Sequence, residues 1–489
     1  MESLFEQLRR YGEGQCYPYH MPGHKRNALG DLPEEIAGRD ITEIEGFDNL
    51  HDPRDLFVRL QQEAAALYGA EKSFYLVNGS TCGILSAISA VLPKGGHILM
   101  SRGSHKSAYH AVYLRNLTVS YLYPELIPGY DIFDAITAGQ VEEALQREPD
   151  IGAVFLVSPT YEGRIAPIEE IARIVHRRGI PLIVDEAHGA HLGLAEGFAR
   201  NSCQAGADIV IHSVHKTLPA MTQTALLHVN GRLVDRELLQ RFLHIYQTSS
   251  PSYILMASID NALRVAARNG EELFGRFLAS YCGMLKQLTA RCRYLKFLLP
   301  EAGRQDIGKL VILTRQAGLS GQKLYDILLK EYQLQLEMAS ESFCLAMFTI
   351  GDGQEGYTRM TEALLAVDAR IGAGALTEER PEGKTFPTDF SVLCSGKEDS
   401  RDGKVSLSQA WDCPARQIPL EQAAGYPTAE FVNLYPPGVP ILVPGEIFAE
   451  ELCRKLKAFW EQGLHVQGIF PEVTQDNGTR CMVRVIDPQ

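Results

Sequence analysis

The 489-residue sequence lacks the signals of a metal-binding, secreted or membrane-spanning protein. Its ten cysteines are scattered from Cys16 to Cys481 without a C-x-x-C pair or a metal-ligand cluster, which is typical of free thiols in a reducing compartment and predicts no metal site. The start, MESLFEQLRRYGEG, has no apolar core of signal-peptide length, and no run of 18 apolar residues follows it. We therefore expect a cytoplasmic protein without a membrane partner.

Positive charge is also scarce, with 47 Lys and Arg against 60 Asp and Glu and a net charge of −13. Binding to nucleic acid requires a basic surface, so this balance argues against a nucleic-acid partner. An acidic field suits a cationic small substrate, although many soluble proteins are acidic without such a reason. The length and the hydrophobic content of 45% allow two or three domains around a large core.

Between about residues 72 and 230, short apolar runs alternate with segments of helical length. The apolar runs are KSFYLV, HILM, TVSYLY, AVFLV, PLIVD, DIVIHS and TALLHV, and the helical segments include TCGILSAISAVL, HKSAYHAVYL and IEEIARIVHRRG. Uninterrupted apolar strands separated by helices predict an α/β fold with a mainly parallel sheet covered on both faces. Ligands of such sheets bind beyond the carboxyl ends of the strands, so polar residues that follow a strand are candidates for a site.

Beyond about residue 300 the pattern predicts a smaller α+β domain, followed by a polar Gly- and Pro-containing linker from Gly372 to Pro387. A helix from about Ile447 to Gln462 indicates a further C-terminal lobe. The predicted parts are an N-terminal segment, a large domain, the small domain and the lobe, at residues 1–50, 51–300, 301–372 and 388–489.

The strongest local signal is DIVIHSVHKT, in which an apolar strand leads directly to Ser213, His215 and Lys216. Most lysines are solvated surface charges. A lysine beside a buried strand differs, because desolvation lowers the pKa of its ammonium group and makes the amine a nucleophile toward an aldehyde. Ser213 and His215 are suitable partners for a phosphate group.

A second signal, PLIVDEAHGAH, places Asp185 at the end of another buried strand and His188 shortly after it. Taken alone, the aspartate is as compatible with a helix cap or a metal ligand as with catalysis. Combined with Lys216, it indicates pyridoxal phosphate, which needs a lysine for its aldehyde and an acid for its pyridinium nitrogen.

Two helix starts complete the pattern. In YLVNGSTCGILSAI, a strand is followed by Gly79, Ser80 and Thr81 at the beginning of a helix, where free N–H groups and the helix dipole favour a phosphate. Serine and threonine are also ordinary helix caps, so this signal depends on Lys216; neither G-x-x-x-x-G-K-[ST] nor G-x-G-x-x-G occurs at this turn. His105 in SRGSHKSAYH is suited to stacking on a flat ring, or to a simple capping role.

In order, these segments resemble the fold-type I ornithine/lysine/arginine decarboxylases, pyridoxal-phosphate enzymes whose large domain is similar to that of aspartate aminotransferase. The resemblance extends over nearly the whole chain. The motifs that carry it are HMPGHK, DITEIEGFDNLHDP, NGST, SHKS, SPTYEG, VDEAHGAH, SVHK, QTSSPSY and YPPGVPILVPGE.

The resemblance implies that Lys216 binds the cofactor aldehyde, that Asp185 pairs with the pyridine nitrogen, and that His105 stacks on the ring. His188 and His215 join them as implied catalytic residues, and either Lys216 or His215 donates the proton to Cα. The further cofactor-binding residues it implies are Gly79, Ser80, Thr81, Thr160, His188, Ser213 and His215. Glu446 is the implied contact for the distal cation of the substrate.

The implied reaction is decarboxylation of a basic amino acid toward polyamine synthesis, with arginine favoured over lysine and ornithine. HMPGHK lies so close to the start that we expect the compact form, without an N-terminal wing domain, and a homodimer rather than a decamer. The segments DITEIEGFDNLH and QTSSPSY are expected to reach the neighbouring subunit. Another reaction on the same scaffold, such as aminotransfer or a lyase step, and a catalytically silent regulatory protein remain the alternatives.

Overall fold

A seven-stranded sheet lies at the centre of the large part of the molecule, in the strand order β1-β7-β6-β5-β4-β2-β3. The computed structural model describes residues 2–28, 30–128, 130, 132–376, 405–434, 438–461, 466–473 and 479–487. The strands are β1 (Lys72–Leu76), β2 (His97–Ser101), β3 (Thr118–Leu122), β4 (Ala153–Val157), β5 (Leu182–Asp185), β6 (Ile209–His212) and β7 (Ala225–Val229).

The strands β3, β2, β4, β5 and β6 are parallel to one another, which confirms the predicted mainly parallel sheet. Strand β7 is the exception, because it runs antiparallel to both β6 and β1. A parallel connection needs a long crossover, usually through a helix. The chain between β6 and β7 contains only the four-residue helix α8 (Val214–Thr217), so it turns back and brings Lys216 to the sheet edge.

Helices cover both faces of the sheet, as the uninterrupted apolar strands predict. Ala153 and Phe155 of β4 pack in one cluster with α4 (Gly79–Val91), α5 (Lys106–Arg115) and α9 (Arg236–Tyr246). Val154 and Leu156 point to the opposite cluster, which contains α6 (Ala138–Arg147) and α7 (Ile168–His176). Successive strand side chains alternate between faces, so one strand contributes to two cores.

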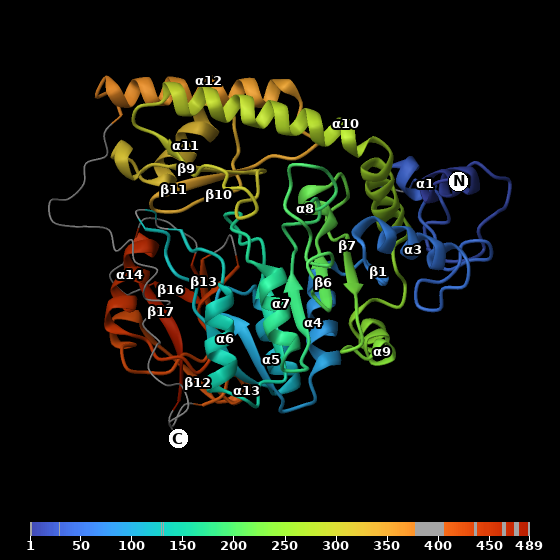
Figure 1. Cartoon of the computed structure of the whole chain (residues 1–489), viewed down its shortest axis with the longest axis horizontal. Coiled ribbons are helices and arrows are strands. Elements are labelled where there is room, and N and C mark those ends of the chain that lie inside the picture. The colour runs from blue at the N-terminus through green and yellow to red at the C-terminus, as the bar shows by residue number, and fades with distance from the viewer. Residues whose placement is uncertain are drawn as a thin grey trace.

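A 39-residue helix, α10 (Tyr253–Arg291), follows the large sheet and was not singled out by the sequence. At 1.5 Å per residue it is about 58 Å long. Figure 1 shows α12 (Gln354–Gly372) lying along α10 at the top of the view. Helix α1 (Leu4–Gly12) packs at its other end, where the Leu4 amide donates to Asp260 Oδ2 at 2.8 Å.

A smaller four-stranded sheet, β10-β11-β9-β8, lies between these long helices and the rest of the chain. Its strands are β8 (Lys296–Phe297), β9 (Lys309–Leu313), β10 (Met338–Ala339) and β11 (Phe343–Met347), and α11 (Gly321–Tyr332) packs on it. This matches the predicted smaller α+β unit.

The C-terminal lobe contains two three-stranded sheets, β12-β17-β16 and β14-β13-β15. Its helix α14 (Glu450–Glu461) is slightly shorter than predicted, and Gln462 lies outside the described residues. So do residues 377–387 of the predicted linker, residues 388–404 of the predicted lobe, and the first three residues of YPPGVPILVPGE. The predicted domain bounds stay predictions.

The remaining elements are α2 (Glu34–Ala37), α3 (Leu56–Tyr68), α13 (Leu407–Asp412), β12 (Ala415–Pro419), β13 (Val432–Leu434), β14 (Pro440–Leu442), β15 (Val466–Gln467), β16 (Ile469–Val473) and β17 (Thr479–Ile486).

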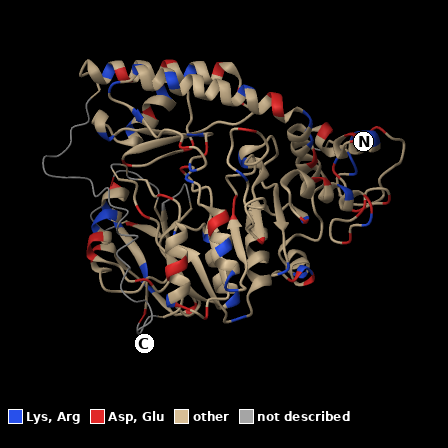
Figure 2. Ribbon diagram, viewed as in Figure 1, with Lys and Arg blue, Asp and Glu red and all other residues tan. Residues whose placement is uncertain are grey.

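Charged side chains of both signs are interspersed over the ribbon, and the strands of the central sheet are largely without them (Figure 2). Within the described part of the chain, no helix is both long and apolar enough to span a bilayer. The nine described cysteines are free thiols, and most of them are buried.

Candidate active site

Lys216 follows strand β6 in helix α8 and meets His188, which follows strand β5. Lys216 Nζ lies 3.0 Å from His188 Nε2. Burial lowers the pKa of Lys216, while Asp185 and Glu337 act in the opposite direction. The two residues come together because β5 and β6 are parallel neighbours whose carboxyl ends meet at one edge of the sheet.

Asp185 is the last residue of β5 and is only 4% exposed. Burial raises the pKa of its carboxyl group to about 6, and the nearby Lys216 lowers it. Asp185 Oδ1 accepts a hydrogen bond from the Ala187 amide at 3.1 Å. A buried carboxyl group thus lies at the end of β5, close enough to the half-buried Lys216 for its charge to act on the carboxyl pKa, and its contact with the cofactor ring stays a prediction.

His105 and His215 lie close to the same cluster. His105 caps helix α5, where its ring accepts from the Ser107 amide, and burial followed by the charge of Lys216 lowers its pKa to about 4. His215 Nδ1 donates to the Thr224 carbonyl at 2.8 Å, and burial lowers its pKa. Both rings are therefore neutral near pH 7, and a neutral His105 can stack on an aromatic ring without the cost of burying a charge.

The beginning of helix α4 is joined to the Lys216 loop. Gly79 has φ of +71°, a conformation that favours glycine, and its amide donates to the Gln223 carbonyl at 2.9 Å. A Cβ at Gly79 would meet no atom within 4 Å, so open space lies beside this turn. Ser80 and Thr81 follow in the first turn of the helix, where Thr81 is exposed and Ser80 is partly exposed.

The Ser213 hydroxyl tests whether these residues fit pyridoxal phosphate. Ser213 is fully buried, and its Oγ has no hydrogen-bond partner among the described residues. A buried hydroxyl without a partner is costly unless another group satisfies it. With the helix start at Gly79, the amine of Lys216 and the acid of Asp185, this arrangement of donors fits the phosphate, aldehyde and ring nitrogen of the cofactor.

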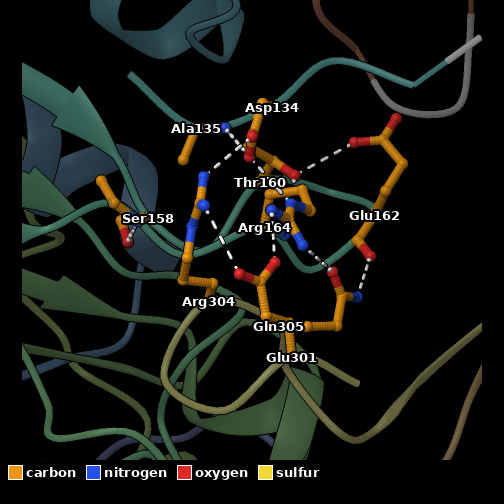
Figure 3. A network of polar contacts seen from close by, with 10 residues as sticks. Asp134, Ala135, Ser158, Thr160, Glu162, Arg164, Glu301, Arg304 and Gln305 are labelled. Carbon is orange, nitrogen blue, oxygen red and sulfur yellow. Dashed lines mark hydrogen bonds and ion pairs between the residues drawn. The ribbon is translucent and has the colours of Figure 1, made fainter. Parts of the chain in front are cut away.

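Thr160 belongs to a polar network that connects the loop after β4 to the segment before β9, shown in Figure 3. Its hydroxyl donates to Glu162 Oε2 at 3.1 Å and accepts from the Arg164 amide. Arg164 is 4% exposed and lies 2.8 Å from Asp134 Oδ1. The Thr160 hydroxyl thus forms its hydrogen bonds with residues of its own loop. Its contact with the cofactor stays a prediction.

Glu446, predicted to bind the distal cation of the substrate, is held by Arg102. Arg102 Nη2 lies 2.8 Å from Glu446 Oε2, and the Arg102 side chain is 3% exposed. Arg102 also donates to the carbonyls of Pro440 and Ile441. This pairing compensates the charge of Glu446 and connects the turn after β2 to the C-terminal lobe.

Sequence reasoning missed Lys309 and Tyr161. Lys309 Nζ lies 2.8 Å from His188 Nδ1, and the Tyr161 ring packs edge-on against His188 at 4.8 Å between centroids. Tyr161 also donates a short hydrogen bond to Glu337. Lys216 was singled out because it follows an apolar strand, whereas Lys309 precedes the apolar residues of one in GKLVIL, and lysines at strand starts were not considered. No group of His, Cys, Asp and Glu in the described ranges is arranged to hold a metal ion.

Two family models match the sequence. The major domain of Orn/Lys/Arg decarboxylases matches residues 2–304, and the C-terminal domain of the same family matches residues 407–487. The chain belongs to the Orn/Lys/Arg decarboxylase family. As a member it is a pyridoxal-phosphate-dependent amino-acid decarboxylase, as the sequence predicted.

Relatives by sequence include an arginine decarboxylase of Bacillus subtilis (strain 168), which is 30% identical over 99% of this chain and 98% of its own length. The constitutive lysine decarboxylase of Escherichia coli (strain K12) is 22% identical over 92% of this chain and 75% of its own length. The crystal structure of a Francisella novicida lysine decarboxylase matches with a TM-score of 0.80 at 18% identity, over 99% of this chain and 81% of that chain.

More distant structures share the large part of the fold. SPT solved with PLP matches with a TM-score of 0.52 at 16% identity, over 65% of this chain and 77% of that chain. These likenesses confirm the predicted aspartate-aminotransferase-like fold with a mainly parallel central sheet and a smaller C-terminal part.

Proposed function

We propose that this decarboxylase acts on a basic amino acid, with arginine favoured over lysine and ornithine, and releases the corresponding amine and CO2 toward polyamine synthesis. The observation that carries this proposal is the half-buried Lys216 amine, which lies 3.0 Å from His188 and close enough to the buried Asp185 to be influenced by its charge. Support for arginine comes from the Bacillus relatives, which are named arginine decarboxylases and align over nearly the full length.

Bound pyridoxal phosphate supplies an electron-accepting ring that stabilises the negative charge left at Cα when the carboxylate departs. The proposed role of Asp185 is to keep a proton on the ring nitrogen, and its burial in the sheet edge strengthens this interaction. The proposed role of the neutral His105 is to stack on the ring when the cofactor is bound, which would exclude water from it. Lys216 or His215 returns a proton to Cα.

The proposed phosphate contacts are the first turn of α4, the Ser213 hydroxyl and His215. Gly79 needs its positive φ to begin this turn, and the Ser213 hydroxyl is available because no described group uses it. Thr160 and His188 keep their proposed roles as contacts to the cofactor. For Glu446, the pairing with Arg102 favours a role in joining the C-terminal lobe to the large sheet.

We further propose a homodimer in the cytoplasm. The segments expected to reach the neighbouring subunit lie together, because His51 Nε2 is 2.7 Å from the Thr248 carbonyl. Tyr253 also donates a short hydrogen bond to the Asp48 carbonyl. Earlier in the chain, three large apolar side chains are at least 65% exposed: Tyr17, Tyr19 and Met21. Exposed apolar residues of this kind support a surface that a second subunit covers. Light scattering on the purified protein measures the assembly.

An aminotransferase of this fold usually binds the substrate carboxylate through an arginine of the small domain, and no such residue could be identified from the sequence. The deciding experiment measures CO2 released from labelled arginine, lysine and ornithine side by side with added pyridoxal phosphate. We expect CO2 without keto-acid formation, and the fastest turnover with arginine. Lys216→Ala is the control: it should lose the visible absorbance of the bound cofactor and nearly all turnover. Keto-acid formation, or a Lys216→Ala protein that retains both signals, contradicts the proposal.

A further inference from the structure

The C-terminal lobe packs on α5, the helix that is capped by His105. Helix α13 of the lobe lies beside α5 at the bottom of Figure 1. The Tyr113 hydroxyl of α5 donates to Asp412 Oδ1 of α13 at 2.7 Å, across 299 positions of sequence. The apolar face of α5 packs in the core of the large sheet. Helix α5 is therefore held on one face by the sheet and on another by the lobe.

Trp411 of α13 contacts two rings of α5. Its indole ring stacks on His110, with 5.8 Å between centroids and 25° between planes, and it meets the Tyr113 ring edge-on at 4.8 Å. Phe431, which is buried, packs edge-on against Trp411 at 4.9 Å. Residues three apart lie on one face of a helix, so Trp411 holds two successive turns of α5 through aromatic contacts.

The lobe also contacts the chain on both sides of His105. Before it, Arg102 pairs with Glu446 and donates to two carbonyls of β14. After it, the amide of Lys106 donates to the Gly438 carbonyl at 3.4 Å. The first amides of a helix have no acceptor within the helix, and here the lobe supplies one. His105 therefore lies between two contacts to the same part of the lobe.

The His105 ring is fixed to its own helix. Its Nδ1 accepts from the Ser107 amide at 3.3 Å and lies 2.8 Å from Ser107 Oγ. Both partners belong to the first turn of α5, so the ring moves with the helix. His105 is partly exposed, and packing alone does not hold its ring. The orientation of the ring thus depends on the contacts that hold α5.

We propose that the C-terminal lobe positions His105 on the bound cofactor and that Trp411 is the positioning residue through which it acts. This inference rests on the stacking role of His105 in the proposed function. Loss of the Trp411 ring leaves the ion pair between Arg102 and Glu446 in place, so the lobe stays attached while α5 loses its aromatic contacts. His105 then stacks less firmly, and the protein releases the cofactor faster.

The test measures the release of the cofactor from the holoenzyme. Free pyridoxal phosphate is achiral, so visible circular dichroism reports the bound cofactor alone, and its decay after dilution into cofactor-free buffer gives the dissociation rate. Trp411→Leu should raise this rate roughly two- to tenfold, the range that an aromatic contact supplies. His105→Ala should also raise it. In the double variant, Trp411→Leu should add nothing further, because its effect passes through His105.

The other of the two tryptophans is a matched control. Trp460 lies on α14, is partly buried like Trp411, and packs on the core of the lobe itself. Trp460→Leu should leave the dissociation rate unchanged. Equal effects of the two tryptophan substitutions would show a general loosening of the lobe and overturn the proposal. A merely structural role of Trp411 predicts the same effect with and without the His105 ring, and that result overturns the proposal too.

A second variant keeps the test decisive if Trp411→Leu does not fold. His110→Ala removes the other ring of the same stack from the side of α5. It should speed the release of the cofactor in the same way, and an unchanged rate contradicts the proposal. An unchanged rate in His105→Ala overturns the stacking role and this inference with it. Failure of the proposed reaction would appear in the CO2 assay, which does not enter these rates.

Discussion

Arg102 and Glu446 are 344 positions apart and form an ion pair of 2.8 Å between the turn after β2 and the C-terminal lobe. Arg102 is almost completely buried and also donates to the Pro440 and Ile441 carbonyls. The Arg102 guanidinium therefore takes most of its acceptors from the lobe, with the Tyr109 hydroxyl of α5 as a further acceptor, and it joins the lobe to the turn after β2.

Glu446→Gln separates the two roles of this residue. Loss of the carboxylate leaves the Arg102 charge buried without its partner, and we expect the free energy of unfolding to fall by about 1–3 kcal/mol, less than for a fully buried pair because Glu446 is partly exposed. Denaturant unfolding measures this change. The KM for arginine should stay within about twofold, since a change in uniform substrate binding would appear there. A large rise in KM with unchanged stability would instead place Glu446 at the distal cation of the substrate.

Arg164 and Arg304 offer a matched pair in the network of Figure 3. Both pair with Asp134 and Glu301, but the side chain of Arg164 is 5% exposed and that of Arg304 is 53% exposed. Arg164→Met should lower the free energy of unfolding by about 3 kcal/mol, whereas Arg304→Met should change it by less than about 1 kcal/mol. Equal effects in denaturant unfolding would show that burial does not determine the strength of these pairs.

Glu186 should make stability depend on pH. Burial raises the pKa of its carboxyl group to about 8, from an ordinary value of 4.5, while Ser202 lowers it. The folded state thus binds a proton that the unfolded chain has released, and the free energy of unfolding falls as pH rises through about 8. His212 lies 2.7 Å away, and burial lowers its pKa to about 3. The titration of His212 therefore makes the free energy of unfolding rise with pH, but only below the ordinary histidine pKa of 6.5.

Between about pH 6.5 and 8, the change in the free energy of unfolding therefore reports on Glu186 and not on His212. Glu186→Gln keeps the shape of the protonated acid and should remove a decline of about 2 kcal/mol across this window. Chemical unfolding of both proteins at several pH values measures the two slopes. Parallel slopes would mean that Glu186 is ionised in the folded protein at neutral pH.

The sequence alone determined the central sheet and the residues at its edge. Asp185 ends one apolar strand, and Ser213 and Lys216 come just after the next, so the rule that parallel strands bring their carboxyl ends to one edge places all three at that edge. The long helix α10 was missed because its polar and apolar residues are mixed over 39 positions, and its packing against α12 and α1 supports it instead.

Contacts between distant segments were decided only by the tertiary structure. The sequence could not predict that Lys309 would meet His188, since 121 positions separate them and the contact depends on how the small sheet is placed against the large one. The same holds for Arg102 and Glu446, and for the reversed direction of β7. Local patterns report which side chains are buried and where strands end, whereas the partner of a buried charge depends on the packing of whole units, which no short stretch of sequence encodes.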